Sequence, residues 1–260
     1  MSDKANYFGP EVAVDHDEGS ADMFTPEKVD PTVDLLVSRA GTGRARELGV
    51  GTGRVALPLA RRGVPVHGID LSEAMVAELR GKPGNEEIET TIGDFASTRV
   101  EGSFSVAYLV FNTIMNLTSQ DEQVDCFCNV ADHLEPDGRF VIEVGVPDLR
   151  RLPEGQTAVP FHVSDTQLGF DLYDTATQYM SSHHVRIVDG QSRHGSIPFR
   201  YVWPAELDLM ARIAGMHLVH RWEDWEGTPF TERSGQHVSV WEKPADCPRR
   251  PACFRHAWRD

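Results

Sequence analysis

The sequence predicts an α/β fold, a doubly wound, seven-stranded and mostly parallel sheet that carries an inserted antiparallel lid. Three observations predict it. Residues 44–71 follow the order strand, glycine turn, helix, strand and acid. Apolar runs of strand length then alternate with helical periods as far as residue 146, as in sheets with helices on both faces. Residues 147–203 replace that rhythm with alternating segments around the hairpin signal Asp189-Gly190.

The glycine turn is the centre of the first unit. A strand over 44–49 leads straight into Gly49-Val50-Gly51-Thr52-Gly53. Glycines allow a sharp turn and a close approach of a ligand to the backbone. They also leave the first N–H groups of the next helix free for an anion. The second strand, 64–69, ends on Asp70, where an acid can accept hydrogen bonds from both hydroxyls of a ribose.

This unit fits any cofactor that contains a nucleoside, and residues 51–56 even satisfy a relaxed dinucleotide pattern. Glu47 favours S-adenosylmethionine, because a carboxylate there would repel a pyrophosphate but could bind the ammonium of a methionine moiety. The G-x-G-x-G spacing points the same way. So does Gly93-Asp94-Phe95 after the third strand, since an acid and an aromatic suit an adenine edge.

In these motifs and their order, residues 30–243 resemble the class I S-adenosylmethionine-dependent methyltransferases. The resemblance implies a Rossmann-like methyltransferase fold with the donor at the carboxyl edge of the sheet, and Leu71 and Phe95 on either side of the adenine. Position by position, it implies a cofactor-binding set of Glu47, Gly49, Gly51, Gly53, Asp70, Leu71, Met75, Asp94, Phe95, Phe111 and Asn112.

The remaining elements have local signals of their own. Asp30-Pro31 predicts a helix start, because an N-cap acid precedes Pro at the first helical position. Ser72 predicts a second cap, and Ser119 with Glu122 predicts a capping box. A further helix begins at Pro204. Apolar runs predict the other strands at 88–93, 104–111, 139–146, 217–225 and 236–242, the last of them antiparallel.

These elements predict five parts along the chain. They are an N-terminal arm over 1–30, a cofactor-binding core over 31–146, an antiparallel lid over 147–203, a completion of the core sheet over 204–243, and a disordered tail over 244–260. Apolar anchors in the arm would let it close over the cofactor.

Composition limits the partners. The net charge of −15 disfavours nucleic acid and anionic membrane surfaces. Cys126 and Cys128 lie two apart on a predicted helix and cannot pair with each other. The cysteines show no metal spacing, and the polar N-terminus has no signal h-region. We therefore expect a cytoplasmic protein without a metal. A homodimer is one open alternative.

The acceptor side carries weaker signals. A sulfonium methyl is already activated, so the protein must mainly align the nucleophile and exclude water. An oxygen or carbon nucleophile usually needs a base, whereas an amine needs only to arrive uncharged. His184 is the first candidate base and His16 the second, followed by His183 and His194. Adjacent strand residues face opposite ways, so only one of His183 and His184 can face a pocket.

Tyr201, Trp203 and Trp222 are predicted to line an apolar acceptor pocket, with packing of the lid onto the core as the alternative. The segment 112–116 lacks the paired Asp and Asn of catechol-type methyltransferases, and no HExxH motif is present. The predicted function is methyl transfer to nitrogen or oxygen of a small molecule, in secondary metabolism. The alternatives are an S-adenosylmethionine-binding protein without turnover and, disfavoured by Glu47, an NAD(P)-dependent oxidoreductase.

Overall fold

The computed structural model describes residue 9 and residues 21–147, 149–188 and 190–245. A seven-stranded sheet A has the order β10-β11-β5-β4-β1-β2-β3. Pairs among β1 to β5 are parallel, whereas β11 is antiparallel to both β5 and β10. This confirms the predicted sheet and its antiparallel last strand. The strands are β1 (Ala45–Leu48), β2 (Val66–Asp70), β3 (Ile88–Ile92), β4 (Phe104–Leu109), β5 (Leu134–Gly145), β10 (His217–Trp222) and β11 (Gln236–Glu242).

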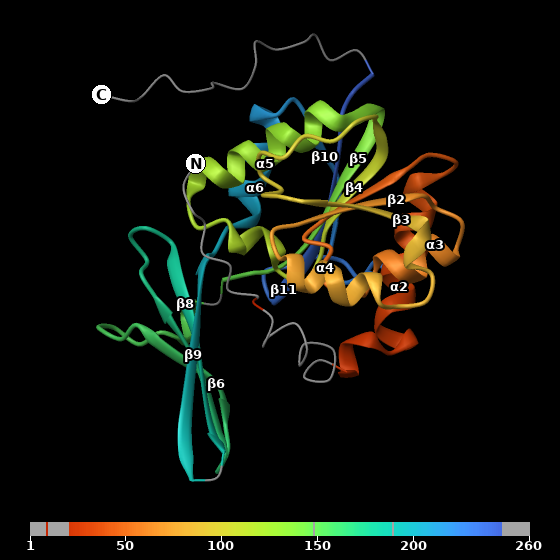
Figure 1. Ribbon diagram of the computed structural model, residues 1–260. Helices are drawn as coiled ribbons and strands as arrows, with labels where there is room; N and C mark the ends of the chain where they lie inside the picture. Colours follow the sequence, from red (N-terminus) through yellow and green to blue (C-terminus); the bar gives the residue numbers. More distant parts are fainter. Residues whose placement is uncertain (1–8, 10–20, 148, 189, 246–260) are drawn as a thin grey trace, which may run out of the picture.

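Helices cover both faces of sheet A (Figure 1). One buried cluster contains Val33, Leu59 and Leu79, which belong to α2, α3 and α4. The other contains Phe127 of α5 and Met210 of α6. The fold is therefore doubly wound, as predicted. The helices are α2 (Pro26–Ala40), α3 (Ala56–Arg61), α4 (Glu73–Arg80), α5 (Gln120–His133) and α6 (Pro204–Ile213), with 3-10 turns η1 (Ala21–Phe24), η2 (Asn85–Glu87), η3 (Thr113–Asn116) and η4 (Leu149–Arg151).

Two of the three predicted caps are present. The hydroxyl of Ser72 accepts the N–H of Met75 at 3.2 Å. Ser119 and Glu122 form the reciprocal capping box at the start of α5. The predicted start of α2 at Asp30-Pro31 is wrong, because the helix begins at Pro26. The extra turn buries Val29 on the sheet face, and this burial outweighs the local cost of Pro31 inside the helix. The predicted boundary at residue 30 thus falls within a helix.

The insertion forms a separate antiparallel sheet B with the order β6-β7-β8-β9, which projects from the body in Figure 1. Val188 pairs with Gln191, so β8 and β9 form a hairpin at the predicted place. The strands are β6 (Ala158–Val163), β7 (Gln167–Tyr173), β8 (Tyr179–Val188) and β9 (Gln191–Arg200).

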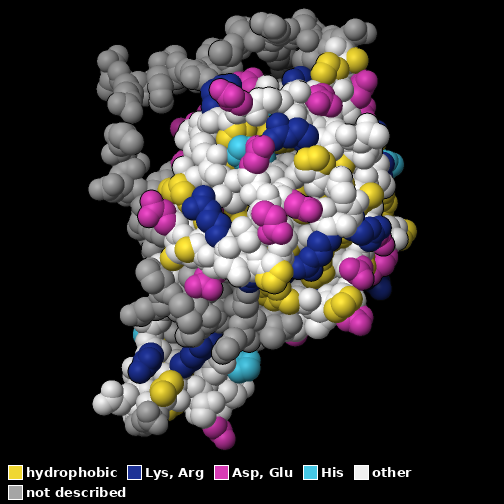
Figure 2. Space-filling view, turned by 45° about the vertical axis from the view of Figure 1, so that its right-hand side comes forward, with side chains coloured by type: hydrophobic (Ala, Val, Ile, Leu, Met, Phe, Trp, Pro, Cys, Tyr) yellow, Lys and Arg dark blue, Asp and Glu magenta, His cyan; other side chains and the backbone are white. Residues whose placement is uncertain are grey.

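Sheet B is anchored at one end only. Met180 and Tyr201 are buried in the same cluster as α5 and α6. At the other end Val163 is 72% exposed and Ile187 is 49% exposed. On the face of the molecule in Figure 2, acidic and basic side chains are interspersed, so that face of the described residues shows no broad basic area.

Candidate active site

The glycine turn has the predicted backbone conformation. Gly49, Gly51 and Gly53 have φ of 76°, 54° and 84°. A Cβ at Gly53 would lie 2.0 Å from Cδ1 of Leu79, so the turn packs tightly onto α4. Nothing lies within 4 Å of the corresponding position at Gly51. The turn is therefore crowded on one side and open on the other, where a ligand could approach the backbone.

Asp70 ends β2 beside this turn. Its Oδ2 accepts the N–H of Gly51 at 2.7 Å, and its Oδ1 accepts the N–H of Ser72 at 2.8 Å. The carboxylate thus joins the glycine turn to the start of α4. It is half-buried, so part of this residue reaches the surface beside the glycine turn.

Glu47 lies beneath the turn rather than on its open side. It is 2% exposed, and its Oε2 accepts the hydroxyl of Tyr108 at 3.0 Å. Burial raises the pKa of Glu47 to about 8, although hydrogen bonds from Tyr108 and from the backbone of Ala56 oppose the rise. The buried carboxyl supports the turn from within. Its contact with a cofactor ammonium stays a prediction.

The predicted adenine-binding residues are split between surface and core. Leu71 is 38% exposed at the end of β2, but Phe95 is 8% exposed and packs in the cluster of α5. Asn129 of α5 donates to the Phe95 carbonyl at 3.0 Å and holds this segment inward. Met75 is buried in α4. Asp94 caps its own loop by accepting the N–H of Ala96 at 3.0 Å.

Beyond β4 the chain makes an unusual turn. Phe111 and Asn112 both have left-handed backbone, with φ of 56° and 62°. This ends β4 at Leu109, two residues before the predicted end. Phe111 is 54% exposed, and Cζ of Arg54 lies 5.5 Å from its ring centroid. The Oδ1 of Asn112 accepts the N–H of Gly145 at 2.6 Å. Phe111 therefore adjoins the glycine turn at the carboxyl edge.

The histidine candidates lie in sheet B, apart from His16, which is outside the described residues. His183 and His194 stack at 5.2 Å, and their Nδ1 and Nε2 atoms are 3.0 Å apart. His184 instead packs against Phe161, so the two neighbours have different surroundings. Burial, followed by the charge of Arg186, lowers the pKa of His184.

The predicted acceptor pocket is not assembled from all three aromatic residues. Tyr201 and Trp203 meet edge to face at 6.3 Å on the α5 side of sheet A. Trp222 packs against the opposite cluster, where it stacks on His220 and lies 6.0 Å from Cζ of Arg39. The face that Trp222 occupies follows from the register of β10, which its sequence does not reveal.

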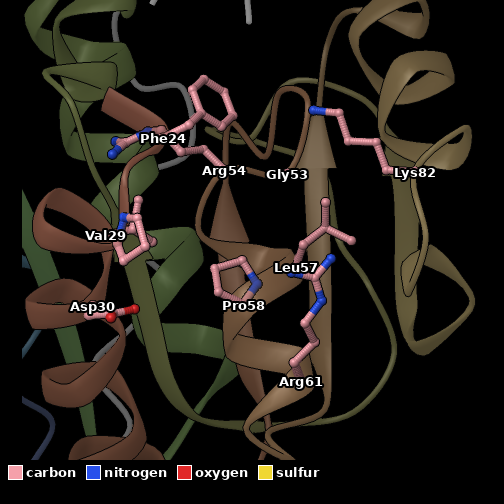
Figure 3. A pocket seen from close by; sticks show the side chains of 10 residues that line it. Phe24, Val29, Asp30, Gly53, Arg54, Leu57, Pro58, Arg61 and Lys82 are labelled. Carbon is pink, nitrogen blue, oxygen red and sulfur yellow. The ribbon is translucent and has the colours of Figure 1, made fainter. Parts of the chain in front are cut away.

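A cavity of about 390 Å³ adjoins the glycine turn. Figure 3 shows side chains of α2 on one side, side chains of α3 on the other, and Lys82 reaching in from the segment after α4. Nη1 of Arg54 lies 3.5 Å from the carbonyl oxygen of Met23, so the described end of the N-terminal arm sits beside the turn. The lining residues are Phe24, Pro26, Val29, Asp30, Gly53, Arg54, Leu57, Pro58, Arg61 and Lys82.

The sequence analysis missed Glu143. Its Oε2 accepts the N–H of Phe111 at 2.9 Å, and its Oε1 accepts the indole N–H of Trp225 at 2.9 Å. A signal was available, because Glu143 is the one acidic residue in the otherwise apolar stretch 140–146. A charge near the carboxyl end of a buried strand indicates a site at that edge.

Two further findings concern metals and membranes. In the ranges that the structure describes, no group of three or more His, Cys, Asp or Glu is arranged to hold a metal ion. Among the helices in those same ranges, none combines the length and apolar character that a membrane span requires.

Comparison with known proteins agrees with this geometry. A methyltransferase domain family matches residues 46–138. The CcbJ methyltransferase from Streptomyces caelestis is 37% identical, with a TM-score of 0.82 over 92% of this chain and 99% of that one. The cypemycin N-terminal methyltransferase of a Streptomyces species is 28% identical over 205 residues, or 76% of this chain and 82% of that protein.

A more distant structure shares the fold. The amino pentose methyltransferase CalS10 from Micromonospora echinaspora, determined with S-adenosylmethionine bound, is 19% identical with a TM-score of 0.65, covering 92% of this chain and 99% of that one. The open side of Gly51 and the half-buried carboxylate of Asp70 beside it fit the same donor. Together with the identity to CcbJ, these features exclude the oxidoreductase alternative. The chain belongs to the class I S-adenosylmethionine-dependent methyltransferases, and its cofactor is S-adenosylmethionine.

Proposed function

We propose that this enzyme methylates the amine of a small molecule in secondary metabolism. The observation that carries the proposal is that polar side chains at the carboxyl edge are committed to N–H groups. Asp70 accepts two backbone N–H groups, Asn112 accepts one, and Glu143 accepts one from the backbone and one from an indole. Such an edge can align reactants, and an amine that arrives uncharged needs only alignment.

The relative that methylates a peptide N-terminus supports an amine acceptor. S-adenosylmethionine supplies a methyl group on a sulfonium, which is already activated. In our proposal the turn at Gly51 and the carboxylate of Asp70 hold the donor, and Phe111 and Asn112 border the reacting end. Alignment of this kind can supply about 7–11 kcal/mol of the barrier without proton transfer.

A hydroxyl acceptor is the second candidate, and one observation favours it. His184 lies in sheet B beside the paired rings of His183 and His194, so imidazole groups that could take a proton are present there. A positioned base typically contributes about 10²–10⁴-fold. We propose sheet B as the lid and residues 1–30 as a closing arm. The five-part division, the homodimer and the cytoplasmic location remain predictions of the sequence.

The test pairs amines with hydroxyl analogues. Three amines are offered with labelled S-adenosylmethionine: a peptide with an N-terminal alanine, free glucosamine, and free proline. We expect methylation of at least one of these amines, but not of their hydroxyl counterparts. Changing His183, His184 or His194 to Ala should each lower turnover by less than about tenfold, because no general base is required. A loss of about three orders of magnitude in His184→Ala alone, with label on a hydroxyl, would favour the second candidate.

Asp70→Ala is expected to weaken S-adenosylmethionine binding by about 1.5–3 kcal/mol, because it removes a charged acceptor from the proposed ribose contact. Calorimetry measures this directly. Asp174→Ala is the matched control, since Oδ1 of Asp174 also accepts an N–H two residues ahead, at 2.9 Å, but in a turn of sheet B. Equal affinities for Asp70→Ala and the wild-type enzyme would remove the ribose assignment.

A further inference from the structure

The turn after β4 is fastened to β5 by three hydrogen bonds. The carboxylate of Glu143 accepts the N–H of Phe111 at 2.9 Å, and its backbone carbonyl accepts the N–H of Asn112 at 3.2 Å. The Oδ1 of Asn112 accepts the N–H of Gly145 at 2.6 Å. A bulky residue such as Phe111 rarely adopts left-handed backbone. Consecutive residues in that region therefore persist because the surroundings fix them.

This turn lies at the reacting end of the proposed site. Asp70 ends β2 on one side of β1, and Phe111 follows β4 on the other side. A Cβ at Gly49 would lie 2.6 Å from Cγ2 of Thr113, so η3 touches the glycine turn directly. The proposed site places the ribose of the donor at Asp70 and its reacting methyl group towards Phe111.

Glu143 connects this turn to a second segment. Its Oε1 accepts the indole N–H of Trp225 at 2.9 Å, and Trp225 belongs to the loop between β10 and β11. One half-buried carboxylate thus accepts hydrogen bonds from Phe111 and Trp225, which lie in two loops and are 114 positions apart in sequence. A neutral amide cannot replace it, because one of its two termini is itself an N–H donor.

We propose that Glu143 is a positioning residue for methyl transfer: it fixes the Phe111–Asn112 turn and Trp225 as the wall against which the acceptor amine is aligned. The inference rests on the proposed N-methylation. In Glu143→Gln either the N–H of Phe111 or the indole N–H of Trp225 loses its acceptor, so the turn and Trp225 are held together less firmly. Asp70 is untouched, and in our proposal Phe111 and Asn112 belong to the acceptor side rather than to the cofactor-binding set that the sequence predicts. Transfer should therefore slow while donor binding persists.

The experiment separates these two quantities. S-adenosylmethionine affinity is measured by calorimetry. The single-turnover rate is measured with labelled S-adenosylmethionine and with whichever of the three amines named above the wild-type enzyme methylates fastest. Glu143→Gln is expected to slow transfer at least about tenfold, which corresponds to 1.36 kcal/mol, and to change the donor Kd less than twofold. Trp225→Phe removes one of the two N–H donors to Glu143. It is expected to slow transfer about threefold, which is less than the loss expected for Glu143→Gln.

Glu122→Gln is the matched control, because Glu122 also accepts a backbone N–H, at 3.1 Å, but within the capping box of α5. It should leave both quantities unchanged. The indole ¹⁵N–H signal of Trp225, assigned by its loss in Trp225→Phe, should shift in Glu143→Gln as its charged acceptor disappears.

An unchanged rate in an active Glu143→Gln enzyme overturns the inference alone. A parallel loss of donor affinity and rate also overturns it, because Glu143 would then act on the cofactor or on folding. Should this variant fail to fold, Trp225→Phe decides the question through the same carboxylate, and an unchanged rate there counts against the inference. A wild-type enzyme that methylates none of the amines overturns the proposed function first.

Discussion

Glu47→Gln is expected to make the protein more stable than the wild type at pH 9 by up to roughly 5 kcal/mol, and to leave its stability nearly unchanged at pH 4. The reason is the pKa of about 8 that burial gives to Glu47 in the folded state, against an ordinary value of 4.5. Each pKa unit corresponds to 1.36 kcal/mol.

The sign follows from proton binding. Between the ordinary pKa and the raised pKa, the folded protein keeps the proton that the unfolded chain has lost. The wild-type free energy of unfolding therefore falls as pH rises from about 4.5 to about 8, and levels off above that range. Glutamine has no proton to lose, so the variant lacks this fall. Its side chain can still accept from Tyr108 or from the N–H of Ala56.

Urea unfolding over a series of pH values measures the difference between the two curves. Glu86→Gln is the control, since Glu86 is exposed in η2 and the same substitution there should not alter the slope. Parallel curves for Glu47→Gln and the wild type would mean that Glu47 is ionised in the fold. An ionised Glu47 would support the predicted contact with the methionine ammonium.

The glycine turn, Asp70 and the helix caps could be predicted because their signals are local. Gly49, Gly51 and Gly53 specify backbone that other residues avoid, and Ser119 with Glu122 forms a capping box over three residues. Such features depend on spacing along the chain, and tertiary packing changes them little.

The features that local patterns do not reveal depend on contacts between distant segments. The hydroxyl that covers Glu47 belongs to Tyr108, 61 residues away. The face that Trp222 occupies is decided by the register of β10 on β11. Phe95 was expected beside a ligand, but its segment is drawn inward by Asn129 of α5. In each case the residue type suggested a role. The direction in which the residue faces, however, depends on a partner far away in the sequence.

Arg200→Met is expected to have the second large effect. It should weaken the attachment of sheet B to the core by about 3–5 kcal/mol. Arg200 is 5% exposed. Its Nη2 lies 2.7 Å from Oε1 of Glu206 and 3.0 Å from Oε1 of Gln178, and its Nη1 lies 2.5 Å from Oε1 of Gln123. Gln123 in turn donates to the carbonyl of Ile114 at 3.3 Å, in η3.

The network therefore fastens the end of β9 to α5, α6 and η3. Burial alone would raise the pKa of Glu206, but hydrogen bonds from Gln178, Arg200 and Gln120 outweigh it and lower that pKa. The stabilisation is thus present above the ordinary pKa of Glu206 and is lost as pH falls through the lowered one. Removing Arg200 leaves a largely buried carboxylate without its cation, which is the costly way to break such a pair.

Hydrogen exchange locates the loss. Amides of β8 and β9 should exchange at least about a hundredfold faster in Arg200→Met, whereas those of β1 and β4 should keep their protection, because they lie outside this network. Arg44→Met is the matched control. Arg44 pairs with Glu89 at 2.8 Å, but the two side chains are 35% and 66% exposed, so the same substitution should cost less than about 1 kcal/mol. Uniform acceleration across both sheets would instead mean that sheet B and the core unfold as one unit, and that Arg200 stabilises the whole protein rather than the attachment of the insertion.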